Sequence, residues 1–255
     1  MKSSNPIWTI IKILLKIHLV IAGINTLFAY REERFEKGDL ENGHIYRWKQ
    51  GKIYYHRRGT GSPVLLIHGL DASDSGRDLD TLSKALSTKH TVYTIDLLGF
   101  GLSDKPWITY TNYLYVLLIQ DFIKDVIGDI TDVFGFEGSC LSLLQARRMD
   151  DSKMGRVVIV NPRYQENFNV PKVLALRLKG LIDFPLYGTF IYNMYSLTCR
   201  TPLNRDGRHV FASRLTGHLE SSLAGHEDLI DDEVKVIKTT GEDVVTYGDL
   251  NTALY

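Results

Sequence analysis

The stretch that most constrains this chain runs from residue 131 to residue 146 and reads TDVFGFEGSCLSLLQA. Residues 132–136 predict a short buried strand, and the apolar residues from Cys140 onward recur at helical spacing. The turn between them consists of Glu137, Gly138 and Ser139. A strand, a sharp turn and a helix in this order lift the apex residue above the carboxyl edge of a parallel sheet, where a nucleophile can act.

The residues of this turn depart from the pattern that such a nucleophile usually has. In Gly-x-Ser-x-Gly, the two glycines leave room for a tight turn around the serine. Here the frame is Gly135-Phe136-Glu137-Gly138-Ser139, so the apex residue is Glu137 and Ser139 replaces the second glycine. The sequence therefore predicts the position for chemistry, but with a carboxylate where the serine hydroxyl is expected.

The rest of the chain predicts strands that alternate with helices. Two strand-like segments, 46–50 and 52–57, flank Gly51 and predict a hairpin. Further strands are predicted at 64–67, 90–95, 156–160 and 234–239, and helices at 77–87, 111–130 and 209–224. This alternation requires right-handed crossovers, so the fold class is α/β with a mostly parallel central sheet and helices on both faces.

Four motifs in order carry a resemblance to a known family. They are Gly-x-Gly-x-Pro at 59–63, His68-Gly69 after an apolar strand, Asp-x-x-Gly-x-Gly-x-Ser at 96–103, and the elbow followed by a strand that closes on Asn161-Pro162. Residues 46–162 thus resemble the α/β-hydrolase family and, more narrowly, its membrane-anchored bacterial members.

The resemblance implies a domain over 46–255 that hydrolyses ester-like or small apolar substrates. It places a helical lid at about 163–205, where the chain is rich in leucines and aromatic residues. It also assigns the backbone amides of Leu70 and Gly138 as donors to an oxyanion. His68 is interpreted as a structural residue under the loop that follows its strand.

Several groups are candidates for the nucleophile. Glu137 could attack as a carboxylate through an ester intermediate, as Asp does in relatives that open epoxides or displace halide. Ser139 is the second candidate, although its hydroxyl suits an N-cap of the helix that follows, and Cys140 is a third. An elbow without catalytic function is the remaining interpretation.

The candidates for the other two catalytic groups, the acid and the base, are Asp243 and His226. Asp243 follows the last predicted strand, near the place where the family's triad acid stands, but a solvated turn aspartate is the competing interpretation. His226 has the Gly-His setting of the family's base, yet it precedes the strand that it should follow, and no histidine comes after it. The chain therefore either ends before its last strand and helix, or is a ligand-binding or scaffolding relative without hydrolytic activity.

The N-terminus predicts a membrane anchor over residues 1–30. Residues 7–30 are apolar except for Lys12, Lys16, His18 and Asn25, and about 20 such residues span a bilayer. A cleaved signal peptide and an amphipathic surface helix are the alternatives. Basic residues before the apolar run favour an extracytoplasmic domain. Residues 31–45 are polar and predict a linker.

The composition of the chain limits the classes of partner that it is expected to bind. The 30 basic and 30 acidic residues balance, which gives no indication of nucleic-acid binding. Cys140 and Cys199 form no metal-ligand spacing, and the glycines at 99 and 101 lack the third glycine of a dinucleotide loop. We therefore expect a small-molecule substrate or ligand and the membrane as partners, with no cofactor and no metal.

Overall fold

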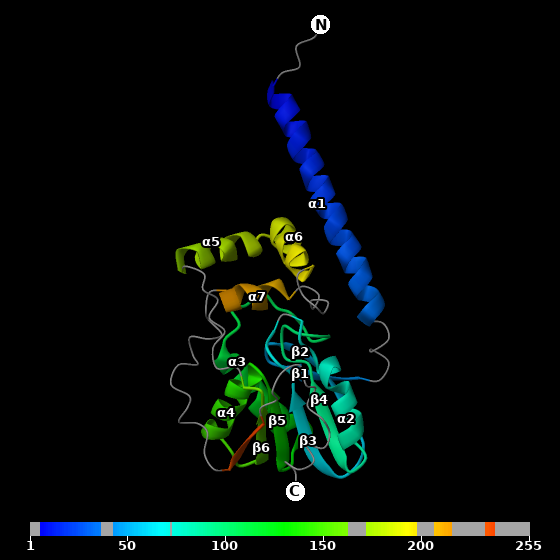
Figure 1. The fold of residues 1–255 in the computed structure, drawn as a ribbon, viewed down its shortest axis with the longest axis vertical. Helices are drawn as coiled ribbons and strands as arrows, with labels where there is room; N and C mark the ends of the chain where they lie inside the picture. The colour runs from blue at the N-terminus through cyan, green and yellow to red at the C-terminus, as the bar shows by residue number, and fades with distance from the viewer. Residues whose placement is uncertain are drawn as a thin grey trace.

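The computed structural model describes residues 6–36, 43–71, 73–162, 172–197, 207–215 and 233–237. Within these ranges, seven strands form one sheet in the order β1-β2-β4-β3-β5-β6-β7 (Figure 1). The strands are β1 (His44–Trp48), β2 (Gly51–Arg58), β3 (Ser62–Ile67), β4 (His90–Ile95), β5 (Thr131–Phe136), β6 (Met154–Val160) and β7 (Val234–Ile237). The first two pairings, β1 with β2 and β2 with β4, are antiparallel, and the other four are parallel. The predicted α/β fold with a mostly parallel sheet is confirmed.

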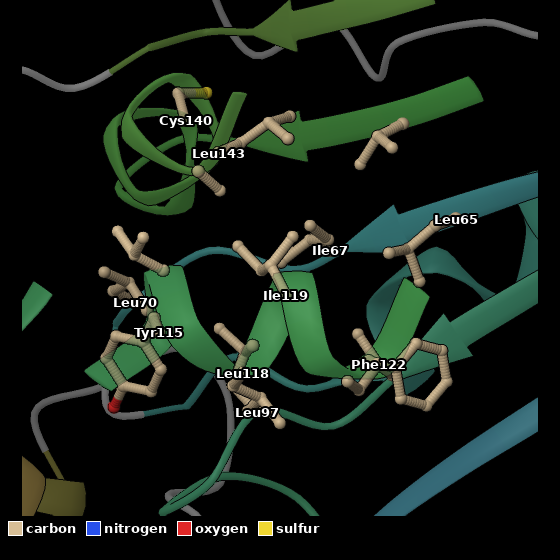
Figure 2. Packing of buried hydrophobic residues seen from close by; sticks show 14 of the residues in the cluster. Leu65, Ile67, Leu70, Leu97, Tyr115, Leu118, Ile119, Phe122, Cys140 and Leu143 are labelled. Carbon is tan, nitrogen blue, oxygen red and sulfur yellow. The ribbon is translucent and has the colours of Figure 1, made fainter. Parts of the chain in front are cut away.

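Helices bury both faces of the sheet. They are η2 (Gly76–Leu79), α2 (Asp80–Leu86), α3 (Asn112–Phe122), the π-helical turn η3 (Ile123–Ile127) and α4 (Ser139–Met149). Leu65 and Ile67 of β3 pack with α3 and α4, as Figure 2 shows, whereas Val64 and Leu66 pack with Leu79 and Leu86 on the opposite face. Alternate residues of a strand point to opposite faces, so burial of both faces explains the continuous apolar runs in the sequence.

Helix α3 is shorter than the predicted helix over 111–130. Thr111 is its N-cap, and its side chain accepts a hydrogen bond from the amide of Leu114. The α-helix ends at Phe122, and η3 ends at Gly128, which has φ 78°. Glycine adopts this left-handed conformation without the steric cost of a Cβ and commonly terminates helices, so residues 129–130 lead into β5 as a loop.

The structure differs from the predicted linker over 31–45 at both of its described ends. Helix α1 (Pro6–Glu36) continues past the apolar run, and β1 begins at His44. Arg and Glu are good helix formers, so the charged segment at 31–34 extends the helix rather than ending it. The register pairs His44 with Tyr55, which fixes the start of the hairpin.

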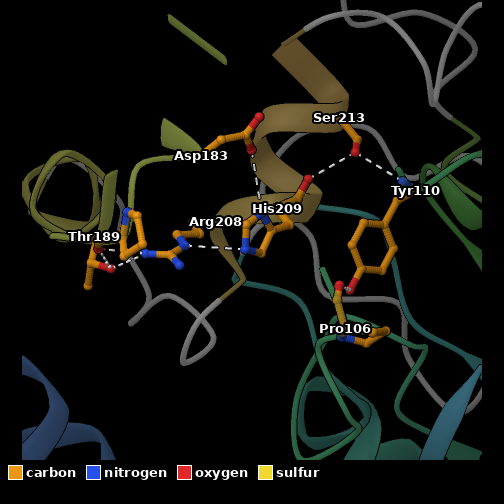
Figure 3. Close-up of polar contacts among 8 residues, drawn as sticks. Pro106, Tyr110, Asp183, Thr189, Arg208, His209 and Ser213 are labelled. Atoms are coloured by element: carbon orange, nitrogen blue, oxygen red, sulfur yellow. Dashed lines mark hydrogen bonds and ion pairs between the residues drawn. The ribbon is translucent and has the colours of Figure 1, made fainter. Parts of the chain in front are cut away.

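The described residues between β6 and β7 form three helices, which we call the helical insertion: α5 (Lys172–Ile182), α6 (Pro185–Ser196) and α7 (Arg208–Leu215). Polar contacts join this insertion to the sheet domain (Figure 3). The Ser213 hydroxyl donates to the carbonyl of His209 at 2.9 Å and accepts from the amide of Tyr110 at 3.0 Å. Within the insertion, His209 Nδ1 in α7 lies 3.5 Å from Oδ1 of Asp183, a residue between α5 and α6. The described parts of the predicted lid, 172–197, are thus helical, and the insertion extends beyond 205 into α7.

The motif at 96–103 forms a closed hydrogen-bonded loop after β4. The carboxylate of buried Asp96 accepts from the amide of Gly76 at 2.6 Å and from the amide of Leu102 at 2.7 Å. The Ser103 hydroxyl donates to the Asp96 carbonyl at 2.6 Å and accepts from the Tyr54 amide at 2.8 Å. The motif therefore maintains the fold at the carboxyl edge of the sheet.

We predict that Asp96→Ala lowers the free energy of unfolding by about 3 kcal/mol, because two backbone donors lose a charged acceptor. Urea denaturation of the detergent-solubilised chain measures the change. Asp96→Asn, which keeps one acceptor, should cost less, and Asp129→Ala provides an exposed control. Equal losses for Asp96→Ala and Asp129→Ala would contradict this role of Asp96.

Candidate active site

Glu137 stands at the apex of the turn between β5 and α4. Its backbone has φ 51°, a left-handed conformation that is uncommon for a residue other than glycine. Its amide donates to the carbonyl of Val160, at the end of β6, at 2.8 Å, and its carbonyl accepts from the amide of Cys140 at 3.3 Å. Strain of this kind persists only where surrounding contacts impose it, and it is common at functional sites.

The glycine two residues before the apex is favoured by close packing. A Cβ at Gly135 would lie 3.0 Å from Leu143 Cδ2 and 3.3 Å from Cys140 Cα, both in α4. A side chain at this position would require α4 to move by a few tenths of an ångström. This contact explains why the motif keeps its first glycine while its central residue has changed.

Ser139 occupies the second glycine's place and stabilises the turn. Its side chain is fully buried. Its oxygen accepts from the amide of Phe136 at 3.1 Å and lies within donor distance of the carbonyls of Phe136, at 2.8 Å, and Ile67, at 3.2 Å. The predicted N-cap role is wrong, because Gly138 is the N-cap residue and no side chain caps this helix. A buried hydroxyl held by the backbone is poorly placed to attack a substrate.

Cys140 is equally withdrawn from solvent. Its thiol is buried and lies 3.2 Å from the carbonyl oxygen of Gly135. Burial raises the pKa of this thiol to about 12, so the reactive thiolate is scarce at neutral pH. Of the three predicted nucleophiles, only Glu137 combines the apex position with partial exposure.

The loop after β3 runs beside the apex. A Cβ at Gly138 would lie 3.2 Å from Leu70 Cβ, and a Cβ at Gly69 would lie 3.4 Å from Glu137 Cβ. The fold thus brings Leu70 and Gly138 together, as the predicted pair of oxyanion donors requires. Their function as donors remains a prediction.

His68 has a structural position. It is buried, and its Nε2 accepts a hydrogen bond from the amide of Leu97 at 3.0 Å. Nε2 must therefore be unprotonated, and Nδ1–H donates to the Gly69 carbonyl at 2.6 Å. Burial lowers the pKa of this imidazole. His68 holds the loop that carries Leu70, and both of its ring nitrogens are engaged.

Two acids missed by the sequence analysis complete the site. Carboxylate oxygens of Asp71, Asp74 and Glu137 all lie within 4.8 Å of one another. The Asp71 amide donates to Asp74 Oδ2 at 2.8 Å, and the Asp74 amide donates to the Asp71 carbonyl at 2.9 Å. The signal in the sequence is a pair of acids three residues apart just after His68-Gly69. These carboxyls suit either a shared proton or a divalent cation with oxygen ligands.

The protonation of Asp74 differs from that of an ordinary aspartate. Burial, together with the charges of Asp71 and Glu137, raises its pKa from 3.8 to about 8. The Asp71 amide opposes this shift only in part. Asp74 is therefore mostly a neutral acid at pH 7, and it stands beside the apex carboxyl as a proton donor.

The two remaining predicted residues, His226 and Asp243, lie outside the described residues. Their proposed functions as base and acid are therefore untested by the structure.

Known proteins resemble this chain in sequence and in fold. Residues 64–212 match the sequence profile of the alpha/beta hydrolase family, which is more than half of the chain, so the chain belongs to this family. The chain is 38% identical over 71 residues to 2-hydroxy-6-oxo-6-(2'-aminophenyl)hexa-2,4-dienoic acid hydrolase of Metapseudomonas resinovorans, covering 28% of this chain and 24% of that protein. It is 35% identical over 95 residues to haloalkane dehalogenase 2 of Mycobacterium tuberculosis, covering 36% of this chain and 30% of that protein.

Solved structures agree on the fold. An alpha/beta hydrolase fold protein from Burkholderia ambifaria has a TM-score of 0.59 at 18% identity, over 76% of this chain and 79% of that chain. The epoxide hydrolase CorEH has a TM-score of 0.58 at 17% identity, over 77% and 81%. The matched segments span less than a third of the curated relatives' length.

We predict that the stability of the chain falls as pH rises from about 4 to about 8, because the folded state keeps Asp74 protonated where the unfolded state ionises it. Asp74→Asn should flatten this dependence by at least about 1 kcal/mol between pH 5 and pH 9, since one pKa unit is about 1.4 kcal/mol. Urea denaturation across this range tests the sign. Parallel pH curves for the two chains would show that Asp74 titrates normally.

Proposed function

We propose that this chain is a membrane-anchored hydrolase of ester-like or small apolar substrates that uses Glu137 in place of the usual serine. The observation that carries the proposal is the apex carboxyl at φ 51°, next to Gly69, Leu70 and a second, neutral carboxyl. The acyl or alkyl carbon of the substrate would be the electrophile. The family membership and the hydrolase and dehalogenase names of the relatives support this reaction class.

The chemistry balances with the two carboxyls alone. The Glu137 carboxylate attacks the electrophilic carbon and forms a covalent bond to it, while the leaving oxygen takes the proton of Asp74. The Asp74 carboxylate then accepts a proton from water, and the resulting hydroxide attacks the carbonyl of the covalent intermediate. The amides of Leu70 and Gly138 would stabilise the oxyanion. Glu137 leaves as a carboxylate and Asp74 is protonated again.

We expect the reaction with Glu137 as nucleophile to be slow compared with that of an aspartate nucleophile. Glutamate is one methylene longer than the aspartate of carboxylate-nucleophile relatives, and a displacement of about 1 Å can cost about 100-fold in rate. The strained backbone at the apex fixes the starting point of this longer side chain, but its extra torsion leaves more conformations to restrict.

A catalytically inactive ligand-binding relative is the second candidate. It is favoured by the position of Ser139, whose hydroxyl is buried and bonded to the backbone of the elbow. The family's usual nucleophile is thus not supplied by the neighbouring serine. In this alternative, the carboxyls bind a ligand without forming a bond to it.

The anchor part of the proposal rests on α1. Residues Pro6–Tyr30 reach a mean hydropathy of 2.0, and only 6% of their most apolar window is buried. A helix of this length and composition can cross a bilayer. Basic residues before the apolar run, against the mixed charges of 31–34 after it, favour the cytoplasmic side for the N-terminus, so the hydrolase domain would be extracytoplasmic.

We predict that Glu137→Gln lowers kcat/KM for short-chain nitrophenyl esters at least about 100-fold, because the amide is a far weaker nucleophile than the carboxylate. Ser139→Ala is the matched control within the same turn and should leave kcat/KM within about threefold while reducing stability by about 1 kcal/mol. A fluorophosphonate probe should not label the chain. Labelling lost in Ser139→Ala would contradict the proposal, and no turnover by the unaltered chain would favour the binding alternative.

We also predict that the full chain stays in the membrane fraction after extraction with alkaline carbonate, because an apolar spanning helix is held by burial in lipid rather than by charge. A membrane-impermeant biotin reagent applied to intact cells should label lysines of the sheet domain. Release of the chain by carbonate would contradict the anchor, and labelling only after cell lysis would contradict the extracytoplasmic orientation.

A further inference from the structure

Helix α1 carries a polar stripe that contacts protein, besides the exposed Lys12 and Lys16 on its N-terminal half. His18 and Asn25 are polar residues within the predicted span, and Ile21 between them is buried. The spacing of 18, 21 and 25 places them on one face of the helix. Polar side chains in a bilayer are costly unless they face protein partners, so this face requires a partner helix.

Helix α6 of the insertion is that partner. His18 Nδ1–H donates to the Leu14 carbonyl at 2.8 Å, which leaves Nε2 to accept from the Tyr187 hydroxyl at 2.6 Å. The two rings also meet edge to face, with centroids 5.3 Å apart.

Asn25 makes the second set of contacts. Its Nδ2 donates to the Leu186 carbonyl at 3.0 Å, and its Oδ1 accepts from Asn193 Nδ2 at 3.0 Å. Asn193 is itself buried. Two hydrogen bonds of the Asn25 side chain thus join α1 to α6.

The depth of these contacts follows from helix geometry. At 1.5 Å per residue, His18 lies about 18 Å along the axis from Pro6, whereas a bilayer's hydrocarbon core is about 30 Å thick. If α1 crosses the bilayer from Pro6, His18 stands near the middle of the core. Tyr187 and the start of α6 must then stand in lipid as well.

The end of α5 and the turn before α6, residues 181–184, have the composition for that environment, and the acid in this turn, Asp183, lies 3.5 Å from His209. Leu181 is 52% exposed and Phe184 is 59% exposed, although both are large apolar side chains. Arg177 is also exposed, one helical turn before Leu181 in α5. Apolar residues beside a cationic one are typical of segments that insert into an interface with anionic headgroups.

We infer that α6 and the α5–α6 turn are embedded in the bilayer beside α1, with lipid acyl chains covering Leu181 and Phe184. This inference rests on the proposed anchor. Its consequence concerns the substrate: α7 of the same insertion packs at the carboxyl edge of the sheet, where a Cβ at Gly99 would lie 2.4 Å from Val210. The insertion therefore lies between the bilayer and the edge that carries Glu137, so the site is suited to apolar molecules dissolved in lipid.

The test places an environment-sensitive nitrobenzoxadiazole label at single introduced cysteines of the full chain, in vesicles of phosphatidylcholine and phosphatidylglycerol. Cys199→Ser supplies the background, and buried Cys140 with its raised thiol pKa should stay unlabelled, which also reports an intact fold. The positions are Phe184→Cys, Leu14→Cys in α1, and Ile130→Cys as an exposed apolar control before β5. Doxyl-labelled lipid quenches a label in the hydrocarbon, and aqueous iodide quenches one in water.

We expect doxyl lipid to quench the labels at 14 and 184 by at least half and to leave the label at 130 unaffected. Iodide should quench the label at 130 and leave the labels at 14 and 184 unaffected. Quenching at 14 but not at 184 would overturn the embedded insertion and leave the anchor standing. If neither position responds to doxyl lipid, the anchor fails and this inference fails with it. Ester turnover measured on the same vesicles reports the active site separately.

Discussion

The geometry of the site depends on the backbone of Glu137 being held in a left-handed conformation at the end of β5. The Glu137 amide is bound to the carbonyl of Val160 in the neighbouring strand, and the buried hydroxyl of Ser139 is bonded to the backbone of Phe136. Gly135 lets α4 pass directly over the strand. These contacts fix the apex whatever its side chain is. The elbow can therefore present a carboxyl without loss of the fold.

The chemical character of the site comes from crowding acids at one edge of a sheet. Glu137 and Asp74 belong to loops that follow different strands, and the parallel arrangement of β3 and β5 brings those strand ends together. Since two nearby carboxyls resist ionising together, the more buried one keeps its proton. One group is then a base or nucleophile and the other an acid. These two roles are the ones that the proposed carboxylate mechanism needs.

The sequence predicted the strands well because both faces of the sheet are buried, which leaves continuous apolar runs at β3, β5 and β6. It predicted Glu137 at the apex because the local frame of glycine and small residues reports the tight turn. It could not predict Asp74, since nothing local shows that its loop meets the elbow. The end of α3 was misplaced because Gly128, a helix terminator, lies inside an apolar periodic segment. The contacts of His18 and Asn25 likewise depend on where α6 folds back.

The helical insertion contacts α1 on one side and the loops of the sheet's carboxyl edge on the other, so in the proposed arrangement it connects the membrane with the site. The proposed chemistry requires that Asp74 and Glu137 interact as a pair of carboxyls. This interaction is tested most directly by ¹³C NMR titration of the aspartate carboxyl carbons, with Asp74→Asn to assign the resonance. We expect Asp74 to titrate near pH 8 and its titration midpoint to move to lower pH in Glu137→Gln. A midpoint near pH 4 that Glu137→Gln does not change would contradict it.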